Sequence, residues 1–304
     1  MALSEYHLKK AAIKRITSTE TKFIRIAAFV VYTYLLYLYT NYVYTSRDKT
    51  EESTIQVYFH YMQSVIGGPM IIVNLIYFGL YYFNFPWLEQ YRLNDMPWPW
   101  ESDPDQWRNS LWKVLRVYCV NQIMIFPVCF YLLTLYFSPD LSVEKIPDFL
   151  TFLWQLILSI FLEDFFFYWN HRLMHLPFLY KRVHKIHHEF KNTIHIASVY
   201  THWLEFILGN FVPMMASLIM LGDKMHVTTL TGYILIRVIG TYAGHSGFEF
   251  PWMPTLDILS AGCAFHNYHH LKNMGNYGSH SWVWDYLFRT SEGYYKEAGL
   301  ENCE

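Results

Sequence analysis

Apolar and polar residues follow one another along this chain in long blocks. Four blocks hold about 20 or more mainly apolar residues, the length that a helix needs to cross the hydrocarbon core of a bilayer. They are Phe23–Tyr44, Val57–Phe85, Leu111–Phe137 and Phe149–Trp169. The intervals between them are rich in proline, tryptophan and charge, which is typical of turns and membrane surfaces. The pattern predicts four membrane-spanning helices.

Two further features refine this picture. The Gly-Gly-Pro at 67–69 and Pro127 are expected to bend the second and third spans, because proline lacks an N–H and clashes with the preceding turn. Glu205–Leu221 and Val227–Gly244 predict a helical hairpin, spanning or re-entrant, with a Gly-Asp tip at 222–223. The expected fold is therefore all-α, a multi-span membrane bundle of about four spans plus a hairpin.

Composition agrees with a membrane protein. Of 304 residues, 53% are hydrophobic and 20% aromatic, and only 16% are charged, against about 25% in typical soluble domains. A soluble bundle would need more charge between its segments. A net charge of −2 gives no argument for nucleic-acid binding, and four cysteines without C-x-x-C spacing imply neither a disulfide framework nor a zinc ribbon.

Basic residues are spread from Lys9 to Arg25, ahead of and into the first apolar block. They could form the polar face of a helix lying on a membrane surface. A mitochondrial presequence is the alternative, which Glu5 and Glu20 weaken. If this basic end is cytosolic, four crossings and the hairpin place every histidine cluster on the cytosolic side.

Histidine makes up 15 residues, and eight of these fall in three clusters. The clusters are His171/His175, His184/His187/His188 and His266/His269/His270. Helical residues three and four apart share a face, so each cluster is expected to aim its imidazoles at one point. A single such pair is usually a surface or core pair, but three clusters favour metal binding. Eight imidazoles exceed the needs of one four-coordinate ion, which predicts a two-metal centre.

The ligand type narrows the chemistry. Many histidines with few cysteines disfavour iron–sulfur clusters and structural zinc. Two non-haem irons at a membrane surface could activate oxygen and attack the unactivated C–H bonds of a lipid. Neither Ser-His-Asp nor P-loop spacing occurs, so hydrolase and nucleotide-hydrolysing functions have little support.

Other residues are candidates for supporting roles. His245 could reach the metal site, and Glu249 could serve as a ligand or as a partner of one. His202 is either such a partner or a helix-end residue, and His280 is either a neighbour of the site or a surface group. The residues just after the third cluster could pack or support the site: Asn276, Tyr277, Trp284 and Asp285.

Glu163 and Asp164 lie near the end of the fourth apolar block. Ionisable side chains are costly in lipid, so such a pair is a candidate functional feature. Solvation of the helix end by water is the alternative interpretation.

Between Glu163 and Tyr294 the chain resembles the fatty acid hydroxylase/sterol desaturase superfamily, and within it most closely the methylsterol monooxygenases, which are sterol 4-methyl oxidases. The resemblance is carried by EDFFFYWNHRLMH, YKRVHKIHHEF, THWLE, GHSG, HNYHH and GNYGSHSWVWDYLF. The three histidine boxes in order are specific for the superfamily. KIHHEF, NYGS and WDYLF favour the sterol branch.

This resemblance implies an integral membrane, O2-dependent di-iron monooxygenase of sterol biosynthesis, with membrane helices in 1–148 and the catalytic domain in 149–304. Electrons would come from NAD(P)H through cytochrome b5 or a reductase, and zinc could replace iron in purified protein. The expected location is the endoplasmic reticulum, with the mitochondrial inner membrane as the alternative. The implied metal ligands and catalytic residues are His171, His175, His184, His187, His188, His266, His269 and His270, with His245 as a further metal ligand.

Departures from the family pattern leave the lipid open. Residues 192–195 replace a Pro-Phe-Gly-like turn, Trp203 follows His202 where proline is usual, and the closing Phe-Gly-Thr is Phe-Arg-Thr at 288–290. A hydroxylase or desaturase acting on another sterol position or on an acyl lipid is one alternative. An accessory or structural subunit of a larger membrane complex, derived from such an enzyme, is another.

Overall fold

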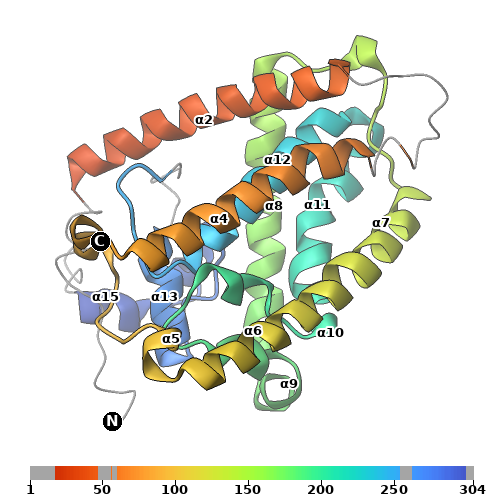
Figure 1. The fold of residues 1–304 in the computed structure, drawn as a ribbon. Helices are drawn as coiled ribbons and strands as arrows, with labels where there is room; N and C mark the ends of the chain where they lie inside the picture. The colour runs from red at the N-terminus through yellow and green to blue at the C-terminus, as the bar shows by residue number, and fades with distance from the viewer. Residues whose placement is uncertain (1–17, 47–55, 57–59, 254–261, 299–304) are drawn as a thin grey trace.

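The computed structural model describes residues 18–46, 56, 60–253 and 262–298, and the regular structure in these residues is helical (Figure 1). Within them, β geometry is confined to two isolated bridges, Arg92 with Phe248 and Asp140 with His226. The all-α prediction is therefore confirmed. The predicted surface helix or presequence falls mainly on residues 1–17, outside the described part.

Five helical segments among the described residues are long and apolar enough to cross a bilayer. They are α2 (Thr19–Ser46), His60–Phe83 with α4 (Gly68–Phe83), Pro104–Thr134 with α6 (Pro104–Tyr118) and α7 (Phe126–Thr134), α8 (Phe149–Met174), and Trp203–Lys224 with α11 (Val212–Leu221). The first four match the predicted spans. The fifth and α12 (Val227–Gly244) form the predicted hairpin, which turns at Gly222–Lys224. The protein is a multi-span membrane protein.

Shorter helices connect these segments, and several of them carry or surround the histidines. They are η3 (Pro86–Tyr91), α5 (Pro99–Ser102), η5 (Val143–Lys145), α9 (Pro177–Arg182), η6 (His184–Glu189), η7 (His195–Val199), α10 (Trp203–Glu205), α13 (Gly262–Lys272), α14 (Val283–Leu287) and α15 (Glu292–Ala298).

Three long helices contain a proline just after a π-helical turn. Gln63–Gly67 precedes Pro69, Cys119–Ile125 precedes Pro127, and Phe206–Phe211 precedes Pro213. Proline cannot donate to the carbonyl four residues earlier and clashes with it, and a wider turn is one way to absorb this inside a continuous helix. The predicted bends at 67–69 and at Pro127 are therefore local π turns. The π turn before Pro213 is of the same kind, and the sequence analysis did not predict a bend there.

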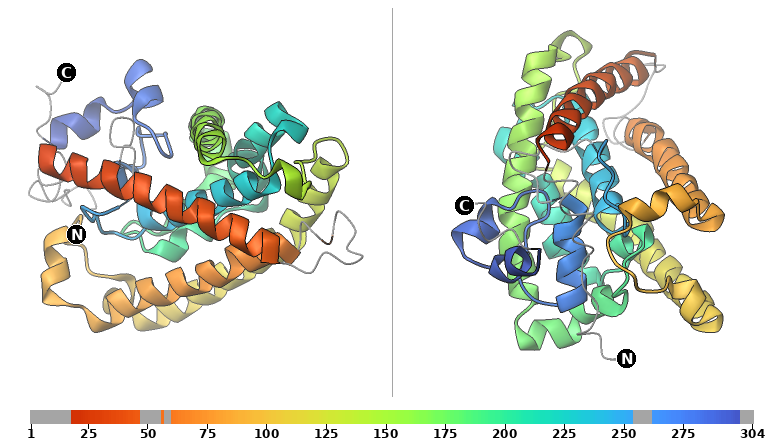
Figure 2. Two further views of the ribbon diagram at one scale, coloured as in Figure 1. Left: turned by 90° about the horizontal axis from the view of Figure 1, so that it is seen from above. Right: turned by 90° about the vertical axis from the view of Figure 1, so that its left-hand side faces the viewer.

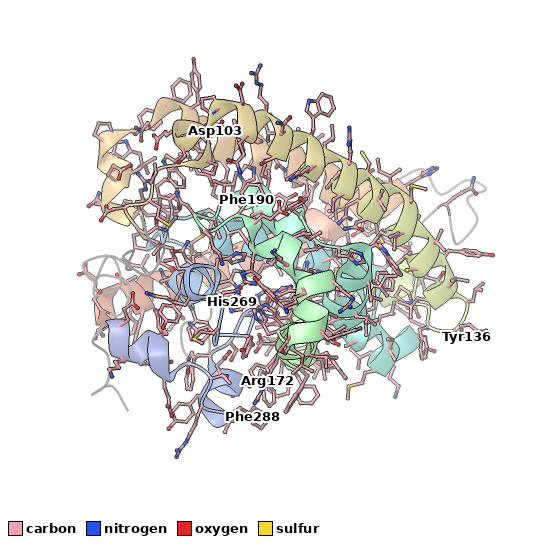
Figure 3. The ribbon with its side chains drawn as sticks, turned by 90° about the horizontal axis from the view of Figure 1, so that it is seen from below. Asp103, Tyr136, Arg172, Phe190, His269 and Phe288 are labelled. Atoms are coloured by element: carbon pink, nitrogen blue, oxygen red, sulfur yellow. The ribbon has the colours of Figure 1, made fainter. Side chains whose placement is uncertain are left out.

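Helices α8, α11 and α12 pack together at the centre, and α2, α4 and the long helix of residues 104–134 lean around them (Figures 1 and 2). Figure 3 shows this long helix running from Asp103 towards Tyr136 along one side of the molecule. The central contact is close. A Cβ added to Gly232 on α12 would lie 2.8 Å from Cζ of Phe152 on α8, so these helices approach through a glycine.

Buried carboxylates fasten α8 to its neighbours. Glu163 accepts a hydrogen bond from Nε of Arg237 on α12 at 2.6 Å, and Nε2 of His280 lies 3.3 Å from its other oxygen. Asp164 accepts three backbone N–H groups of residues 279–281 at 2.8–3.2 Å. Solvation of the helix end is therefore the wrong interpretation of this pair, since both residues are enclosed and cross-link α8 to α12 and the C-terminal segment.

Candidate metal centre

Four elements bring the predicted histidines together. His171 lies in the last turn of α8 and His175 at its end, η6 carries the second cluster, His245 follows α12, and α13 carries the third cluster. Helix α8 stops here because Pro177 begins α9 and disfavours a helical residue before it. The second cluster is on a 3₁₀-helix rather than an α-helix.

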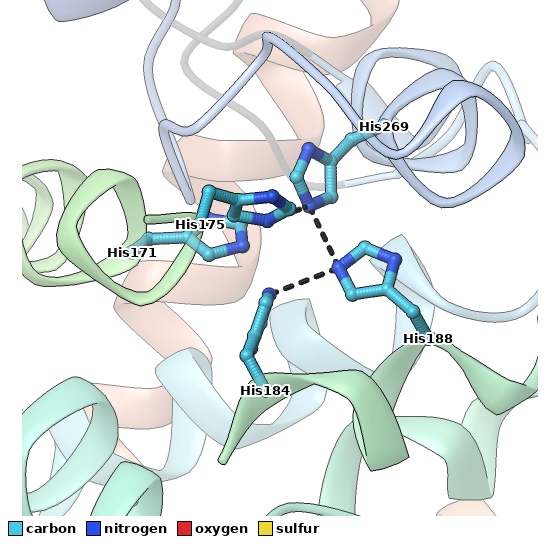
Figure 4. A group of neighbouring side chains, drawn as sticks. All are labelled: His171, His175, His184, His188 and His269. Atoms are coloured by element: carbon cyan, nitrogen blue, oxygen red, sulfur yellow. Dashed lines mark hydrogen bonds between the residues drawn. The ribbon is translucent and has the colours of Figure 1, made fainter. Parts of the chain in front are cut away.

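The nine histidines form two groups, and within each group the ring nitrogens lie within 4.8 Å of one another. The first group is His171, His175, His184, His188 and His269, and the second is His187, His245, His266 and His270. All are buried except His175, which is partly exposed. The geometry of the first group is drawn in Figure 4, and Figure 3 places His269 in the interior of the bundle.

In each of the two H-x-x-H-H clusters, the middle histidine belongs to a different group from the other two. His184 and His188 belong to the first group and His187 to the second, whereas His266 and His270 belong to the second and His269 to the first. In both clusters the first histidine shares its group with the histidine four residues later and not with the one three residues later. The prediction that each cluster aims at a single point is confirmed for His171 and His175, which both belong to the first group. It is wrong for the two H-x-x-H-H clusters, each of which contributes to both groups.

Hydrogen bonds fix the tautomer of several rings. Nδ1 of His171, His269 and His245 lies 2.9, 2.6 and 2.8 Å from the carbonyl oxygens of Tyr277, Gly275 and Thr241, respectively. A carbonyl only accepts, so each Nδ1 carries the proton and each Nε2 presents a lone pair. Tyr277, a predicted supporting residue, acts through its backbone.

The Nε2 atoms of neighbouring histidines lie close to one another within each group. Nε2 of His269 lies 3.2 Å from Nε2 of both His175 and His188, and Nε2 of His245 lies 2.9 Å from that of His266 and 3.3 Å from that of His187. One neutral ring nitrogen can satisfy one hydrogen bond, so such crowding suits a shared cation. The donor set, all imidazole with no thiolate, fits iron, zinc or copper.

Burial keeps these imidazoles neutral and ready to bind metal. It is the largest cause that lowers the pKa values of His187, His188 and His269 well below the ordinary imidazole value. Burial likewise lowers the pKa of His184 to about 3 and that of His245 to about 4. Metal ligation needs the unprotonated ring, so the enclosed site supplies it at neutral pH.

The same pKa shifts predict that metal-free protein loses stability in acid. Below about pH 6.5 the histidines of the unfolded chain bind protons. The buried histidines of the folded chain stay unprotonated to lower pH, because their pKa values are lower. The free energy of unfolding therefore falls as pH falls. The melting temperature of metal-free protein in detergent should be lower at pH 5.5 than at pH 7.5. His187→Asn should make this dependence shallower, because it removes one of the buried imidazoles. Equal melting temperatures at both pH values would contradict the prediction.

Glu205 is a supporting residue that the sequence reading missed. Its Oε1 lies 2.8 Å from Nδ1 of His184, both side chains are buried, and no described residue hydrogen-bonds its Oε2. A carboxylate behind an imidazole orients the ring and makes it a stronger ligand. The signal available in the sequence was the acidic residue that ends THWLE, three positions after His202.

Glu205→Gln should weaken metal binding at the first group by about 10- to 100-fold, because the amide can accept the hydrogen bond but brings no charge. The measurement is metal retained per chain against increasing chelator. Glu101→Gln, which changes the cap of α5, is the matched control. Identical retention in the Glu205 variant and the unmodified protein would rule out this role.

The remaining candidates have other positions. Glu249 is absent from both groups and accepts hydrogen bonds from Arg25 and the start of α13, so it is not a ligand. His202 accepts the backbone N–H of Leu204 through Nδ1 and so caps α10. Of its two expected roles, it therefore has that of a helix-end residue. His280 is a neighbour of the site rather than a surface group, since it pairs with Glu163 beside the cavity described next.

A cavity of about 550 Å³ lies against both histidine groups. Its walls include His171 and His184 of the first group and His187, His245 and His266 of the second. Most of the rest of its lining is apolar and comes from α8 and α12. A mainly apolar cavity with polar groups among its walls suits a lipid that presents one portion to the histidines.

Comparison with known proteins agrees with this site. Residues 156–290 match the model of the fatty acid hydroxylase family. C-4 methylsterol oxidase erg25 of Schizosaccharomyces pombe is 30% identical over 243 residues, covering 74% of this chain and 76% of that protein. Methylsterol monooxygenase 1 of Danio rerio is 30% identical over 244 residues, covering 77% and 80%. Very-long-chain aldehyde decarbonylase GL1-8 of Oryza sativa subsp. indica is 34% identical over 197 residues, covering 61% and 72%. No solved structure matches the chain.

Fold, site and relatives together define a membrane-embedded oxidoreductase with histidine clusters that could hold metal ions. The chain belongs to the fatty acid hydroxylase family. The resemblance read from the histidine boxes is confirmed. The named relatives differ in their lipids, so membership alone leaves the substrate of this chain open.

Proposed function

We propose that this protein oxidises a 4-methyl group of a sterol at a centre of two iron ions. The supporting observation is the pair of histidine groups opening on one apolar cavity at the end of a membrane span. In this proposal the first group, with His171, His175, His184, His188 and His269, holds one ion, and the second, with His187, His245, His266 and His270, holds the other. Residues 149–304 form the catalytic domain and 1–148 the membrane part before it.

Bound iron would supply the activation of O2 and the oxidation of an unactivated C–H bond. The chain contributes the rest. Backbone carbonyls and Glu205 hold the ligand rings in the metal-binding tautomer. The mainly apolar lining of the cavity keeps water from the reacting carbon and positions the lipid.

The electron supply and the location follow the same proposal. NAD(P)H would deliver electrons through cytochrome b5 or a reductase at the cytosolic face of the endoplasmic reticulum. Lys181, Arg182 and Lys185 lie beside or within the second cluster at exposed positions. Their positive charge agrees with a cytosolic orientation of the histidines.

Similarity to aldehyde decarbonylases favours a second candidate, oxidation of another lipid such as a long-chain aldehyde or acyl chain. Both candidates use the same centre and cavity. They differ in the shape of the molecule that the cavity accepts.

The test is turnover by iron-loaded protein in proteoliposomes with NADPH, reductase, cytochrome b5 and a 4,4-dimethylsterol. We expect O2-dependent formation of the 4-hydroxymethyl and then the 4-carboxy sterol, identified by mass spectrometry, and no product from the 4-desmethyl sterol. Oxidation of a long-chain aldehyde or acyl lipid without sterol turnover would favour the second candidate instead.

A further inference from the structure

The cavity follows α8 for most of its length. Residues from Trp154 to Met174 on one face of this helix line it. At 1.5 Å per residue this stretch spans about 30 Å, close to the thickness of the hydrocarbon core. The histidines lie at one end of the stretch, so the cavity extends from the metal centre far along a membrane span.

At its other end the cavity wall is also the outer surface of the protein. Trp154, Ile157 and Phe161 line the cavity, yet 48%, 39% and 51% of these side chains are exposed. They belong to a helix long and apolar enough to cross the bilayer, so this surface faces lipid. By contrast, His171 and His187 at the inner end are 4% and 5% exposed.

We propose that the substrate enters sideways from the bilayer through a lateral mouth formed by Trp154, Ile157 and Phe161. The identity of the lipid rests on the function proposed above, but the route does not. A lipid that passed through water would expose its apolar surface, at about 25 cal/mol for each Å². Movement within the membrane avoids this cost.

Sideways entry also determines which end of the lipid reaches the histidines. An amphiphile keeps its polar end at the membrane surface, since burying an unpaired hydroxyl is unfavourable. His171 lies in the last turn of α8, about 15 Å along the helix from Phe161. A lipid moving sideways therefore presents carbons near its polar end to the metal centre and keeps its tail towards the mouth. In a sterol these carbons include C4, beside the carbon that bears the hydroxyl.

The chain offers a matched pair of variants for the mouth. Phe161 and Phe166 both lie on α8 and are 51% and 40% exposed, but only Phe161 lines the cavity. Phe161→Gln should raise KM, expressed as mole fraction of sterol in the bilayer, by about fivefold, with kcat and metal content unchanged. Phe166→Gln should leave KM unchanged. Equal KM values for the two variants would overturn the proposal.

A labelling measurement keeps the route testable without turnover. A sterol carrying a photoreactive group on its tail, mixed into proteoliposomes, should attach to residues 154–161, and unlabelled 4-methylsterol should compete. Ile157→Trp, which narrows the mouth, should reduce this attachment. Attachment at residues 177–182 of α9 instead of α8 would overturn lateral entry. If unmodified enzyme oxidises no sterol, the proposed reaction fails, and a photoreactive acyl lipid in the same experiment still decides the route.

Discussion

His187→Ala and His269→Ala should each abolish product formation, by at least about 100-fold, in protein that still inserts into the membrane. Each residue is the middle histidine of its cluster, and each belongs to the group that the rest of its cluster does not join. His187 is one of four rings in its group, and His269 is one of five. Removing a ligand weakens metal binding by more than the 10- to 100-fold expected for loss of a supporting residue.

The two variants should lose the metal ion from different sites. This result would distinguish the two groups of the structure from the sequence-based prediction that each cluster aims at a single point. His187→Ala should empty the site that His266 and His270 share, whereas His269→Ala should empty the site that His184 and His188 share. Elemental analysis should give about one metal per chain in each variant, and iron spectroscopy should show different remaining signals. His60→Ala, at an exposed position, is the control. Retained turnover in either ligand variant would contradict the assignment.

Arg25→Leu should destabilise the protein by about 3–5 kcal/mol, the cost of leaving a buried carboxylate without its partner. Arg25 on α2 donates from Nη2 to Oε1 of Glu249 at 2.8 Å, and the two side chains are 3% and 0% exposed. The other oxygen of Glu249 accepts the backbone N–H of Ala264 at 2.7 Å, in the first turn of α13. Loss of the cation should therefore also loosen the helix that carries His266, His269 and His270.

The measurement is the melting temperature in detergent together with metal content. Arg25→Leu combined with Glu249→Gln should recover part of the loss, because no uncompensated charge then remains. Wild-type stability in the single variant would show that the pair contributes nothing. Gly262 allows Glu249 to lie close to the start of α13. Its φ of +68° suits glycine, and a Cβ there would lie 3.1 Å from Oε2 of Glu249.

Arg25 also illustrates where reading the sequence fails. It stands at the end of a run of basic residues, which suggests a charged surface, and it is instead one of the more deeply buried residues of α2. Its partner lies 224 residues further along the chain. Nothing in the local pattern around either residue indicates that they meet.

The sequence by itself determined the membrane helices, the hairpin and the three clusters that hold eight of the nine grouped histidines, while the resemblance to the family added His245. These features depend on local properties, because the thickness of a bilayer sets the length of an apolar block and imidazole is a metal ligand wherever it lies. Only the tertiary structure decided how the histidines divide into two groups, that Glu205 and the carbonyl of Tyr277 orient them, and that a cavity joins them to the lipid-facing side of α8. Those features depend on contacts between distant segments. The packing of α8, α12 and α13 sets the geometry of these contacts, and the spacing of residues within a single helix does not.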